Sequence, residues 1–360
     1  MHITQLLIKN LRCFKEYSLQ LEAPLVLLCG SNGSGKTSLL EAVHYGCYLR
    51  SFRTHLPREL IRHGQDTFFI NIQFKDHLER HELQVGFSQS SKKRLVKINQ
   101  RPIQTYKELT DHYRIITLTS DDLALIQEGP ELRRTFIDQA IALADPDYSA
   151  ALRTYKHIHA NRNALLYNGT SNDELYHTWT QQLWNQSCVV QAKRQEQLHA
   201  LQERTNALLA AFLPNALRIT FTYRPRLIGN ATSWPQFLAS RPQLYEQERA
   251  FGRSLFGAHL DDIAIHFQDK GSKAFASRGQ QKLIVFLLKV AQLQELVAKK
   301  GPCTLLVDDF MADFDTERIK MLLALLTSLK CQLILTSPTS TGDLPDTLKE
   351  LGAQIACLTD

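Results

Sequence analysis

The sequence predicts an α/β fold interrupted by a helical insertion, and three patterns support that prediction. Residues 25–29 are apolar on both faces, as in a buried strand, and they run into a glycine-rich loop and an apolar helix. Residues 303–307 and 332–336 repeat the buried-strand pattern, separated by a helical stretch at 318–329. From 145 to 213, apolar side chains instead recur every three or four residues. We therefore expect one sheet built from both ends of the chain, with helices inserted between them.

Short strands are expected beside this sheet. Residues 3–21 alternate apolar and polar side chains, and the runs at 68–74, 83–87 and 95–98 are also strand-like. A period of two is typical of antiparallel strands with one buried face. These segments predict an antiparallel subdomain next to the glycine-rich loop.

The inserted region predicts an antiparallel helical hairpin. A helical period extends over 174–213, and residues 168–173 before it are a cluster of turn formers. Two packed helices of an ordinary all-α domain give the same pattern, so that alternative stays open. The expected division is an α/β domain of residues 1–110 and 265–360, and a mostly helical second domain of residues 111–264.

Composition limits the class of protein. Of 360 residues, 44% are hydrophobic and 22% charged, which provides a large core and excludes global disorder. No apolar stretch approaches the roughly 20 residues that span a bilayer, and Lys9 and Arg12 interrupt the region where a signal peptide needs an apolar core. We expect a cytoplasmic protein without a membrane partner. The net charge of +6 suits a polyanionic partner, although many ordinary cytosolic proteins are equally basic.

The cysteines form no recognisable framework. They are seven in number and scattered, and no C-x-x-C pair occurs, which fits neither a disulfide scaffold nor a zinc site. We expect reduced thiols that mostly fill the core. The seven are Cys13, Cys29, Cys47, Cys188, Cys303, Cys331 and Cys357.

The glycine-rich loop matches G-x-x-x-x-G-K-[ST] in full and lies between a strand and a helix, the context that a P-loop requires. Glycines let backbone N–H groups surround a β-phosphate, and the helix N-terminus adds a favourable dipole. We expect Lys36 to contact the β- and γ-phosphates of ATP and the Thr37 hydroxyl to hold Mg²⁺. A chance glycine-rich turn is the alternative. The predicted phosphate-binding residues are Gly30, Ser31, Asn32, Gly33, Ser34, Gly35, Lys36 and Thr37.

Paired carboxylates follow the strand at 303–307. An acidic pair at such a place is often a helix cap or part of a solvated loop. After a P-loop, however, the first acid organises Mg²⁺ and the next one orients or deprotonates the attacking water. We therefore expect Asp308 at the metal and Asp309 at the water, with Lys36 as the third catalytic residue.

A third element precedes the apolar helix that starts near residue 280. Ser-x-Gly at a helix N-terminus presents a hydroxyl, a close-approaching backbone and a dipole, which suit a γ-phosphate. A simple N-cap is the more common explanation of the local pattern. Its position ahead of Asp308 is nevertheless the order found in ATPases of the ABC class. The predicted nucleotide-binding residues here are Ser277, Arg278, Gly279 and Gln280.

In these elements and others, the chain resembles the RecF family of bacterial recombination-mediator ATPases over essentially its whole length. The residues that carry the resemblance are Ile8-Lys9-Asn10-Leu11-Arg12, the P-loop, Ser51-Phe52-Arg53-Thr54, Gly129-Pro130-Glu131-Leu132-Arg133-Arg134 running to Asp138, Ala276 to Lys282, and the Asp308-Asp309 pair.

The resemblance implies an ABC-type P-loop ATPase head that dimerises around two ATP molecules. Each ATP lies between the P-loop of one subunit and residues 277–279 of the other. It also implies binding to single-stranded or gapped DNA and cooperation with RecR and RecO in loading the recombinase RecA, in DNA damage repair, replication and the SOS response. Many ABC ATPases carry glutamate where this chain has Asp309, whose shorter side chain predicts weak, slow ATP hydrolysis.

The chain departs from the family pattern at three places. Gly-Pro-His-Arg-Asp-Asp becomes Gly257-Ala258-His259-Leu260-Asp261-Asp262, which removes an arginine. Ser-Glu-Leu-Asp after the acidic pair becomes Ala312-Asp313-Phe314-Asp315, so that subunit contacts there are in doubt. Ser120 stands where the family usually has proline, ahead of Asp122.

Two other functions compete with this interpretation. An ABC transporter's nucleotide-binding subunit needs a membrane partner and usually a histidine where this chain has Thr336 and Ser337. An ATP-dependent nuclease needs a further carboxylate-rich metal site, for which Asp261-Asp262 is a thin candidate. For DNA contact, a basic set interleaved with Phe52 is available, although for any single residue of the set a solvated basic edge is the more common explanation. The set is Arg50, Arg53, Lys92, Lys93, Arg94, Lys97 and Arg101.

Overall fold

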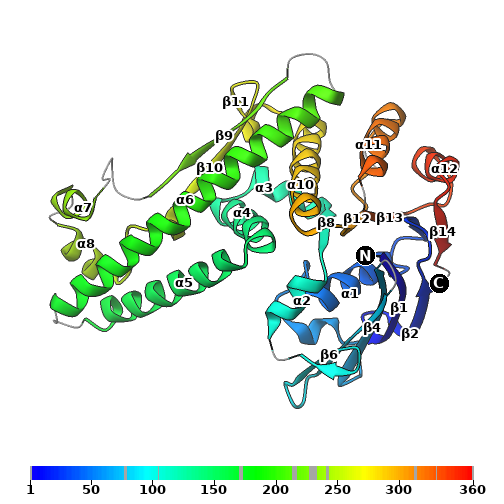
Figure 1. Cartoon of the computed structure of the whole chain (residues 1–360), viewed down its shortest axis with the longest axis horizontal. Coiled ribbons are helices and arrows are strands. Elements are labelled where there is room, and N and C mark those ends of the chain that lie inside the picture. Colours follow the sequence, from blue (N-terminus) through cyan, green and yellow to red (C-terminus); the bar gives the residue numbers. More distant parts are fainter. Residues whose placement is uncertain are drawn as a thin grey trace. The chain divides into compact units, whose positions relative to one another are not determined.

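The chain divides into two compact units in the computed structural model (Figure 1). The first unit contains Met1–Asp122 and Leu293–Asp360, and the second contains Leu123–Gln292. The sequence placed the domain boundaries at 110/111 and 264/265, so the compact units have different bounds. Residues 115–119 belong to the first unit because they pair within its parallel sheet, and residues 265–292 belong to the second unit. The structure describes residues 2–76, 79–103, 105–169, 173–212, 217–226, 233–240, 243–311, 314–329 and 331–358.

A five-stranded parallel sheet forms the centre of the first unit, with the order β14-β3-β13-β12-β8. Its three middle strands are buried along their whole length, which explains their unbroken apolar sequences. The prediction of one sheet from both ends of the chain is confirmed. The strands are β3 (Leu25–Cys29), β8 (Ile115–Thr119), β12 (Thr304–Asp308), β13 (Gln332–Ser337) and β14 (Gln354–Cys357).

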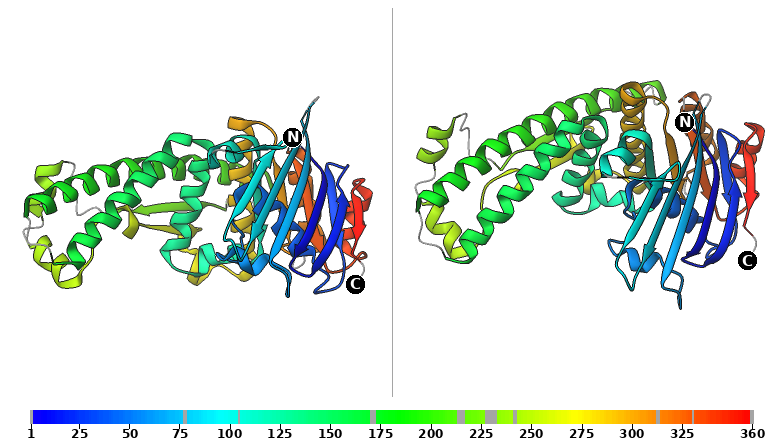
Figure 2. Two further views of the ribbon diagram at one scale, coloured as in Figure 1. Left: turned by 90° about the horizontal axis from the view of Figure 1, so that it is seen from below. Right: turned by 60° about the horizontal axis from the view of Figure 1, so that its bottom comes forward.

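A six-stranded antiparallel sheet is the second layer of this unit, with the order β2-β1-β4-β5-β6-β7; Figure 2 shows its strands in blue to cyan. In β4, Phe68, Ile70, Ile72 and Phe74 are buried while the residues between them are more exposed, as a period of two requires. The expected antiparallel subdomain is confirmed. Its strands are β1 (His2–Leu11), β2 (Phe14–Gln20), β4 (Thr67–Asp76), β5 (Glu79–Ser88), β6 (Arg94–Ile98) and β7 (Arg101–Pro102).

Helix α1 (Lys36–Tyr48) contacts strands of both sheets: β1, β4 and β5 on one side, β8 and β12 on the other. It is therefore buried on most of its circumference, and its apolar residues Leu39, Leu40 and Val43 are almost inaccessible. The P-loop helix is thus held from two sides. Figure 1 shows the remaining helices of this unit, which are η1 (Pro57–Leu60), α2 (Tyr106–His112), α11 (Thr316–Ser328) and α12 (Asp343–Glu350).

In the second unit, α5 (Pro146–Tyr167) and α6 (Asp173–Phe212) pack against each other as the expected antiparallel hairpin (Figure 1). Residues 170–172 of the predicted turn, and residue 213, lie outside the described residues. The hairpin is accompanied by a three-stranded sheet, in the order β11-β10-β9, that the helical pattern did not predict. Its strands are β9 (Ile219–Arg224), β10 (Asp262–Phe267) and β11 (Lys270–Gly271).

Shorter helices complete the second unit, and none of the described helices combines the length and hydropathy needed to cross a bilayer. Helix α10 (Arg278–Lys300) begins in the second unit and ends in the first. The others are η2 (Ser120–Leu123), which crosses the boundary, α3 (Ala124–Gln127), α4 (Pro130–Ala144), α7 (Trp234–Ser240), α8 (Leu244–Phe251), η3 (Ala258–Leu260) and α9 (Ser272–Phe275).

Candidate nucleotide site

The P-loop connects β3 to α1 by a backbone path that needs glycine. Gly33 and Gly35 have φ angles of 92° and 97°, in the left-handed region that side chains disfavour. A Cβ atom on Gly35 would also collide with the Phe14 ring, and one on Gly30 would lie 2.6 Å from Ser34 Oγ. The glycines therefore fix the loop geometry, independently of the lysine beside them.

The interior of the loop contains a cation and an unsatisfied hydroxyl. The Lys36 side chain is buried, and its Nζ donates to the carbonyl oxygens of Gly30 (2.7 Å) and Ser31 (2.8 Å). Ser34 Oγ is buried and has no hydrogen-bond partner among the described residues. Buried polar atoms without partners are rare, and a phosphate oxygen is a suitable acceptor for both groups. The loop thus fits the phosphate chain of a nucleotide.

The start of α1 and the ends of two strands bring hydroxyl and carboxylate oxygens together next to this loop. Thr37 Oγ1 donates to Asp308 Oδ1 at 3.1 Å, and Thr336 Oγ1 donates to the same oxygen at 3.0 Å. β3, β13 and β12 are neighbours, so their carboxyl ends meet at one edge. Hard oxygen ligands of this kind are those that Mg²⁺ prefers. The structure therefore brings Thr37, next to Lys36, into contact with Asp308, and their roles at ATP and Mg²⁺ stay predictions.

Asp308 is nine-tenths buried, and burial raises its pKa above the ordinary value, with the charge of Asp309 acting in the same direction. The hydrogen bonds from Thr37 and Thr336 and the charge of Arg53 lower that pKa in part. No cation forms an ion pair with Asp308 among the described residues. A bound divalent cation would supply the missing positive charge and favour the ionised form.

Asp309 occupies an unusual backbone position. Its φ is 47°, in the left-handed region, where Asp and Asn occur more often than other side chains. Its N–H donates to Thr336 Oγ1 at 2.8 Å, while its carboxylate is exposed. Thr336 therefore touches both acids. Sequence reasoning noted Thr336 only as a missing histidine, although a hydroxyl at the end of a strand beside the P-loop strand was the available signal.

Glu41 is a structural centre that sequence reasoning missed. Its carboxylate is fully buried in α1 and accepts from Arg12 Nε (2.8 Å) and Nη2 (2.7 Å). Ser51 Oγ also donates to it, and in turn accepts from the backbone N–H groups of Arg53 and Thr54. The two N-terminal family segments thus meet at one carboxylate on the P-loop helix. No short-range pattern shows this, because the partners are 10 and 29 residues away.

Ser277 begins α10 in the second unit as a reciprocal cap. Ser277 Oγ accepts from the Gln280 N–H at 3.3 Å, and Gln280 Oε1 accepts from the Ser277 N–H at 2.8 Å. A serine hydroxyl that accepts one hydrogen bond still has its own proton to donate. Ser277, Arg278 and Gln280 are exposed, and Gly279 is half-buried. The N-cap and the expected phosphate contact are therefore compatible; the contact itself stays a prediction.

The altered segment at 257–262 has a structural role. Asp261 is fully buried and accepts from Arg194 Nη1 (3.1 Å), Tyr223 Oη (2.5 Å) and Gln191 Nε2 (2.8 Å). Asp262 forms an ion pair with Arg133 at 2.9 Å. Both carboxylates are thus committed to protein cations, and no group of acids, histidines and cysteines suited to a metal occurs among the described residues. The nuclease alternative loses its only candidate.

The second altered segment is only partly described. Residues Ala312 and Asp313 lie outside the described residues, while Phe314 is buried and Asp315 caps α11 by accepting from the Arg318 N–H at 2.9 Å. Ser120 begins η2, and Asp122 Oδ2 accepts from the Thr119 N–H at 2.8 Å. Subunit contacts at 312–315 remain a prediction.

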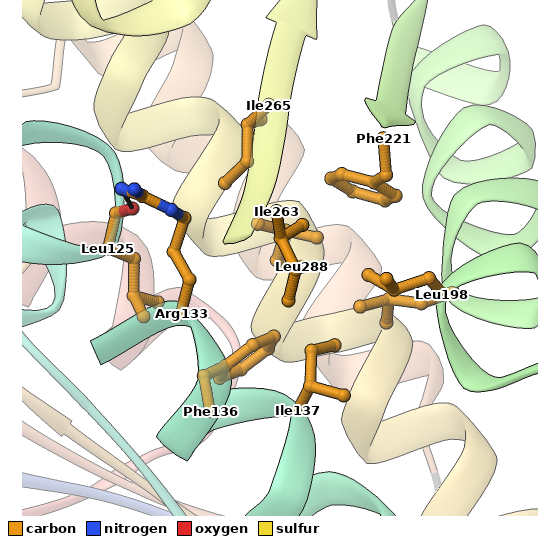
Figure 3. A pocket seen from close by; sticks show the side chains of 10 residues that line it. Leu125, Arg133, Phe136, Ile137, Leu198, Phe221, Ile263, Ile265 and Leu288 are labelled. Atoms are coloured by element: carbon orange, nitrogen blue, oxygen red, sulfur yellow. Dashed lines mark hydrogen bonds between the residues drawn. The ribbon is translucent and has the colours of Figure 1, made fainter. Parts of the chain in front are cut away.

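A small cavity of about 20 Å³ lies in the second unit, and Figure 3 shows it from nearby. Its lining is apolar except for Arg133, which is engaged with Asp262. The space is close to the volume of one water molecule. It cannot hold a nucleotide, and we regard it as a packing gap between α4, α6, β10 and α10.

The parallel sheet with a P-loop after β3 and an acidic pair after β12 defines the head of an ABC-type ATPase. The model of the family described as RecF/RecN/SMC N terminal domain matches residues 2–342, so the chain belongs to this family, in its RecF branch. A relative from Leptospira interrogans named "DNA replication and repair protein RecF" is 31% identical, over 88% of this chain and 87% of its own. One from Natranaerobius thermophilus with the same name is 27% identical, over 94% and 91%.

Solved structures agree on the fold. One described as the recombination mediator protein RecF with ATP, in the RecFOR pathway, superimposes with a TM-score of 0.83 at 22% identity, over 94% of each chain. An Smc head domain with an extended coiled coil, derived from Pyrococcus furiosus, gives a TM-score of 0.55 at 16% identity, over 96% of this chain and 91% of its own. At these identities the comparison supports the fold alone.

Proposed function

We propose that the chain is an ATP-gated DNA-binding protein of recombinational repair and replication, with slow ATP hydrolysis. The observation that carries the proposal is the hydrogen bond between Thr37 Oγ1 and Asp308 Oδ1, which joins the P-loop to the acidic strand end at 3.1 Å. A P-loop sequence alone can be a chance turn, and an acid alone can be a helix cap. Here the two lie in contact although they are 271 residues apart in the sequence, and this is the arrangement that nucleotide hydrolysis requires.

Each site residue has a distinct task in this proposal. Lys36 exchanges its contacts with the loop carbonyls for the β- and γ-phosphates of ATP. Thr37 and Asp308 hold Mg²⁺, which would neutralise the negative charge that develops on the phosphates. Asp309 accepts the proton of the attacking water, and Thr336 fixes the backbone that carries Asp309. Hydrolysis is slow because the aspartate side chain is short.

The DNA-related part of the proposal rests on family membership and on the names of the relatives. We infer that ATP brings two copies together, with Ser277 and Gly279 of one copy facing the nucleotide of the other. The dimer binds single-stranded or gapped DNA in the cytoplasm and works with RecR and RecO to load the recombinase. Charge supports this modestly, because Lys92, Lys93 and Arg94 are exposed at the turn between β5 and β6.

The central test is Lys36→Ala. The glycines set the loop backbone, so the variant should still fold cooperatively, although it loses the two hydrogen bonds from Lys36 to loop carbonyls. ATP binding should weaken by at least about a hundredfold, because a charge-assisted contact is removed from a buried site. Lys15→Ala, an exposed lysine of β2, is the matched control. Calorimetric titration with ATP and Mg²⁺ decides the matter, and unchanged affinity in the Lys36 variant would remove the proposal.

The dimer is tested at Ser277. Ser277→Asp keeps an N-cap acceptor but replaces the hydroxyl donor with a negative charge, so it should leave monomer ATP binding near normal and block ATP-induced dimerisation. Ser277→Arg should block it sterically. Light scattering with ATP, with and without gapped DNA, gives the mass. A Ser277→Asp variant that still dimerises would show that Ser277 is an N-cap only.

A further inference from the structure

Two pairs of cysteines lie side by side in the five-stranded sheet, at opposite ends of its strands. Cys29 of β3 and Cys357 of β14 are registered neighbours, and the Leu358 N–H donates to the Cys29 carbonyl at 2.7 Å. Cys303 and Cys331 precede the registered residues Thr304 and Gln332 at the other end. Parallel strands are roughly 4.8 Å apart, within the range of Cα separations that disulfides bridge.

The two pairs differ in access. Cys303 and Cys331 are both buried, so neither sulfur is accessible to an oxidant in solution, and burial raises the pKa of each thiol to about 12. Cys357 is exposed at the edge of the sheet, while its neighbour Cys29 is buried. Only the Cys29 and Cys357 pair therefore combines an accessible thiol with a second thiol behind it.

The surroundings of this pair include the nucleotide site. Cys29 directly precedes Gly30, and a Cβ atom on Gly30 would lie 3.0 Å from the carbonyl oxygen of Leu358. Burial and the neighbouring Cys357 raise the pKa of Cys29 to about 11, while the cations of Lys349 and Lys36 act in the opposite direction. The P-loop lysine is thus part of the electrostatic environment of the thiols.

We propose that Cys29 and Cys357 form an oxidisable dithiol site beneath the P-loop, whose disulfide form disturbs the nucleotide site. The oxidant is a hydroperoxide such as hydrogen peroxide. Cys357, being accessible, attacks one peroxide oxygen and becomes a sulfenic acid as water is released. The Cys29 sulfur then attacks the sulfenic sulfur, and the hydroxyl leaves as a second water. Two thiols and one peroxide thereby give one disulfide and two waters, and the thiols supply both electrons.

The disulfide acts on the loop through geometry. A disulfide prefers a Cα separation of about 5.5–6 Å, wider than the roughly 4.8 Å between paired strands, so it shifts the end of β14 relative to β3. Leu358 already approaches the start of the loop closely at Gly30. Gly30 also supplies one of the carbonyl oxygens that hold Lys36. A shift of a few tenths of an ångström at this position moves the lysine and the backbone N–H groups that face the phosphates. This consequence rests on the proposed ATP binding, whereas formation of the disulfide does not.

The experiment treats the full-length protein with stoichiometric hydrogen peroxide and maps disulfides by mass spectrometry of peptides. ATP affinity is measured before oxidation, after it, and after dithiothreitol. The expected result is a Cys29–Cys357 disulfide, no Cys303–Cys331 disulfide, and ATP binding weakened at least about tenfold, the effect of losing roughly one charge-assisted phosphate contact. Dithiothreitol should restore the affinity.

Matched variants separate this site from general oxidation. Cys357→Ser should be resistant, and Cys13→Ser should behave like the wild type, because Cys13 is also exposed and its Sγ also lies against the P-loop at Gly35. No Cys29–Cys357 disulfide, equal sensitivity in Cys357→Ser, or a disulfide without change in ATP affinity overturns the proposal. If the reduced protein binds no ATP, the proposed function fails, and the disulfide map alone decides whether the dithiol site exists.

Discussion

Two pairs of adjacent aspartates border strands of this protein, and they have opposite surroundings. Asp308 at the end of β12 receives hydrogen bonds from two hydroxyl groups, those of Thr37 and Thr336. Asp261, just before β10, is paired with the Arg194 guanidinium, and Asp262 with that of Arg133. Hydroxyls stabilise a carboxylate without cancelling its charge, whereas an arginine cancels it. The protein thus leaves one pair able to attract a cation and uses the other to hold the second unit together.

The largest expected effect comes from Asp309, the exposed member of the first pair. Asp309→Asn removes the proposed base but keeps the size and tolerates the left-handed φ of 47°. General-base catalysis contributes about 10²- to 10⁴-fold, so single-turnover hydrolysis should fall by that factor while ATP affinity stays unchanged and the ATP-bound dimer lasts longer. An Asn variant that hydrolyses ATP normally would assign water activation to another group.

For the second pair, Asp261 and Asp262, substitution should lower the stability of the fold rather than the rate of ATP hydrolysis. Asp261→Asn removes one of the two carboxylates that Arg194 contacts, while Arg194 keeps its ion pair with Asp138. The new amide also cannot accept from every buried donor that Asp261 accepts from, so about 1.5–3 kcal/mol of unfolding free energy should be lost. Asp262→Asn is the control, because its partner Arg133 is nearer the surface, and about 1 kcal/mol is expected there. Urea denaturation of both variants measures the difference. Equal losses would mean that burial does not distinguish the two aspartates.

A smaller effect is expected at Thr336, which touches both acids of the first pair. Thr336→Val removes hydrogen bonds to Asp308 and to the Asp309 backbone, so turnover should fall about tenfold, the equivalent of roughly one or two net hydrogen bonds. Thr336→Ser retains the hydroxyl and should be near normal. Loss of turnover in the serine variant as well would indicate packing rather than hydrogen bonding.

The smallest effect concerns pH, and its sign differs between the two regions. Burial and the neighbouring His159 lower the pKa of His259 from 6.5 to about 3. Between pH 6.5 and 3 the unfolded chain therefore protonates this histidine while the folded protein does not, and the free energy of unfolding falls as the pH falls. Burial raises the pKa of Asp308, so its contribution falls as pH rises. The second unit should lose up to about 1 kcal/mol between pH 7.5 and 5.5.

Thermal unfolding at these two pH values checks this, with His259→Gln as the comparison. The variant should show a smaller drop in melting temperature than the wild type. An equal drop in both proteins would assign the acid sensitivity to other groups.

Local patterns predicted the parts of the fold that short segments determine. The buried strands, the P-loop and the hairpin helices follow from periodicity, and the five-stranded sheet followed from matching strands at both ends of the chain. The sequence places residues 115–119, which form β8, in the helical domain. Nothing near these residues indicates that their partner strand is β12, some 190 residues away. β9 to β11 were missed because short strands among long helices carry a weak signal.

The candidate site shows the same limit. A contiguous motif located Lys36 and Thr37, and a strand end located Asp308, all of which the structure brings together. Thr336 and Glu41 depend on tertiary contacts and could not be recognised alone. Ser277 to Gln280 lie in the second unit, so their part in binding a nucleotide remains a prediction.

Glu41 has a consequence for which substitutions this chain tolerates. Losing Arg12 takes its main partner from the fully buried Glu41 carboxylate, a change that costs about 3 kcal/mol or more at a buried pair. Exchanging both residues for well-packed apolar ones is often nearly neutral. Exchanging both residues together should therefore cost less stability than removing Arg12 alone. Because Arg12 lies in the turn between the first two strands and Glu41 in the P-loop helix, the pair couples the stability of these two segments.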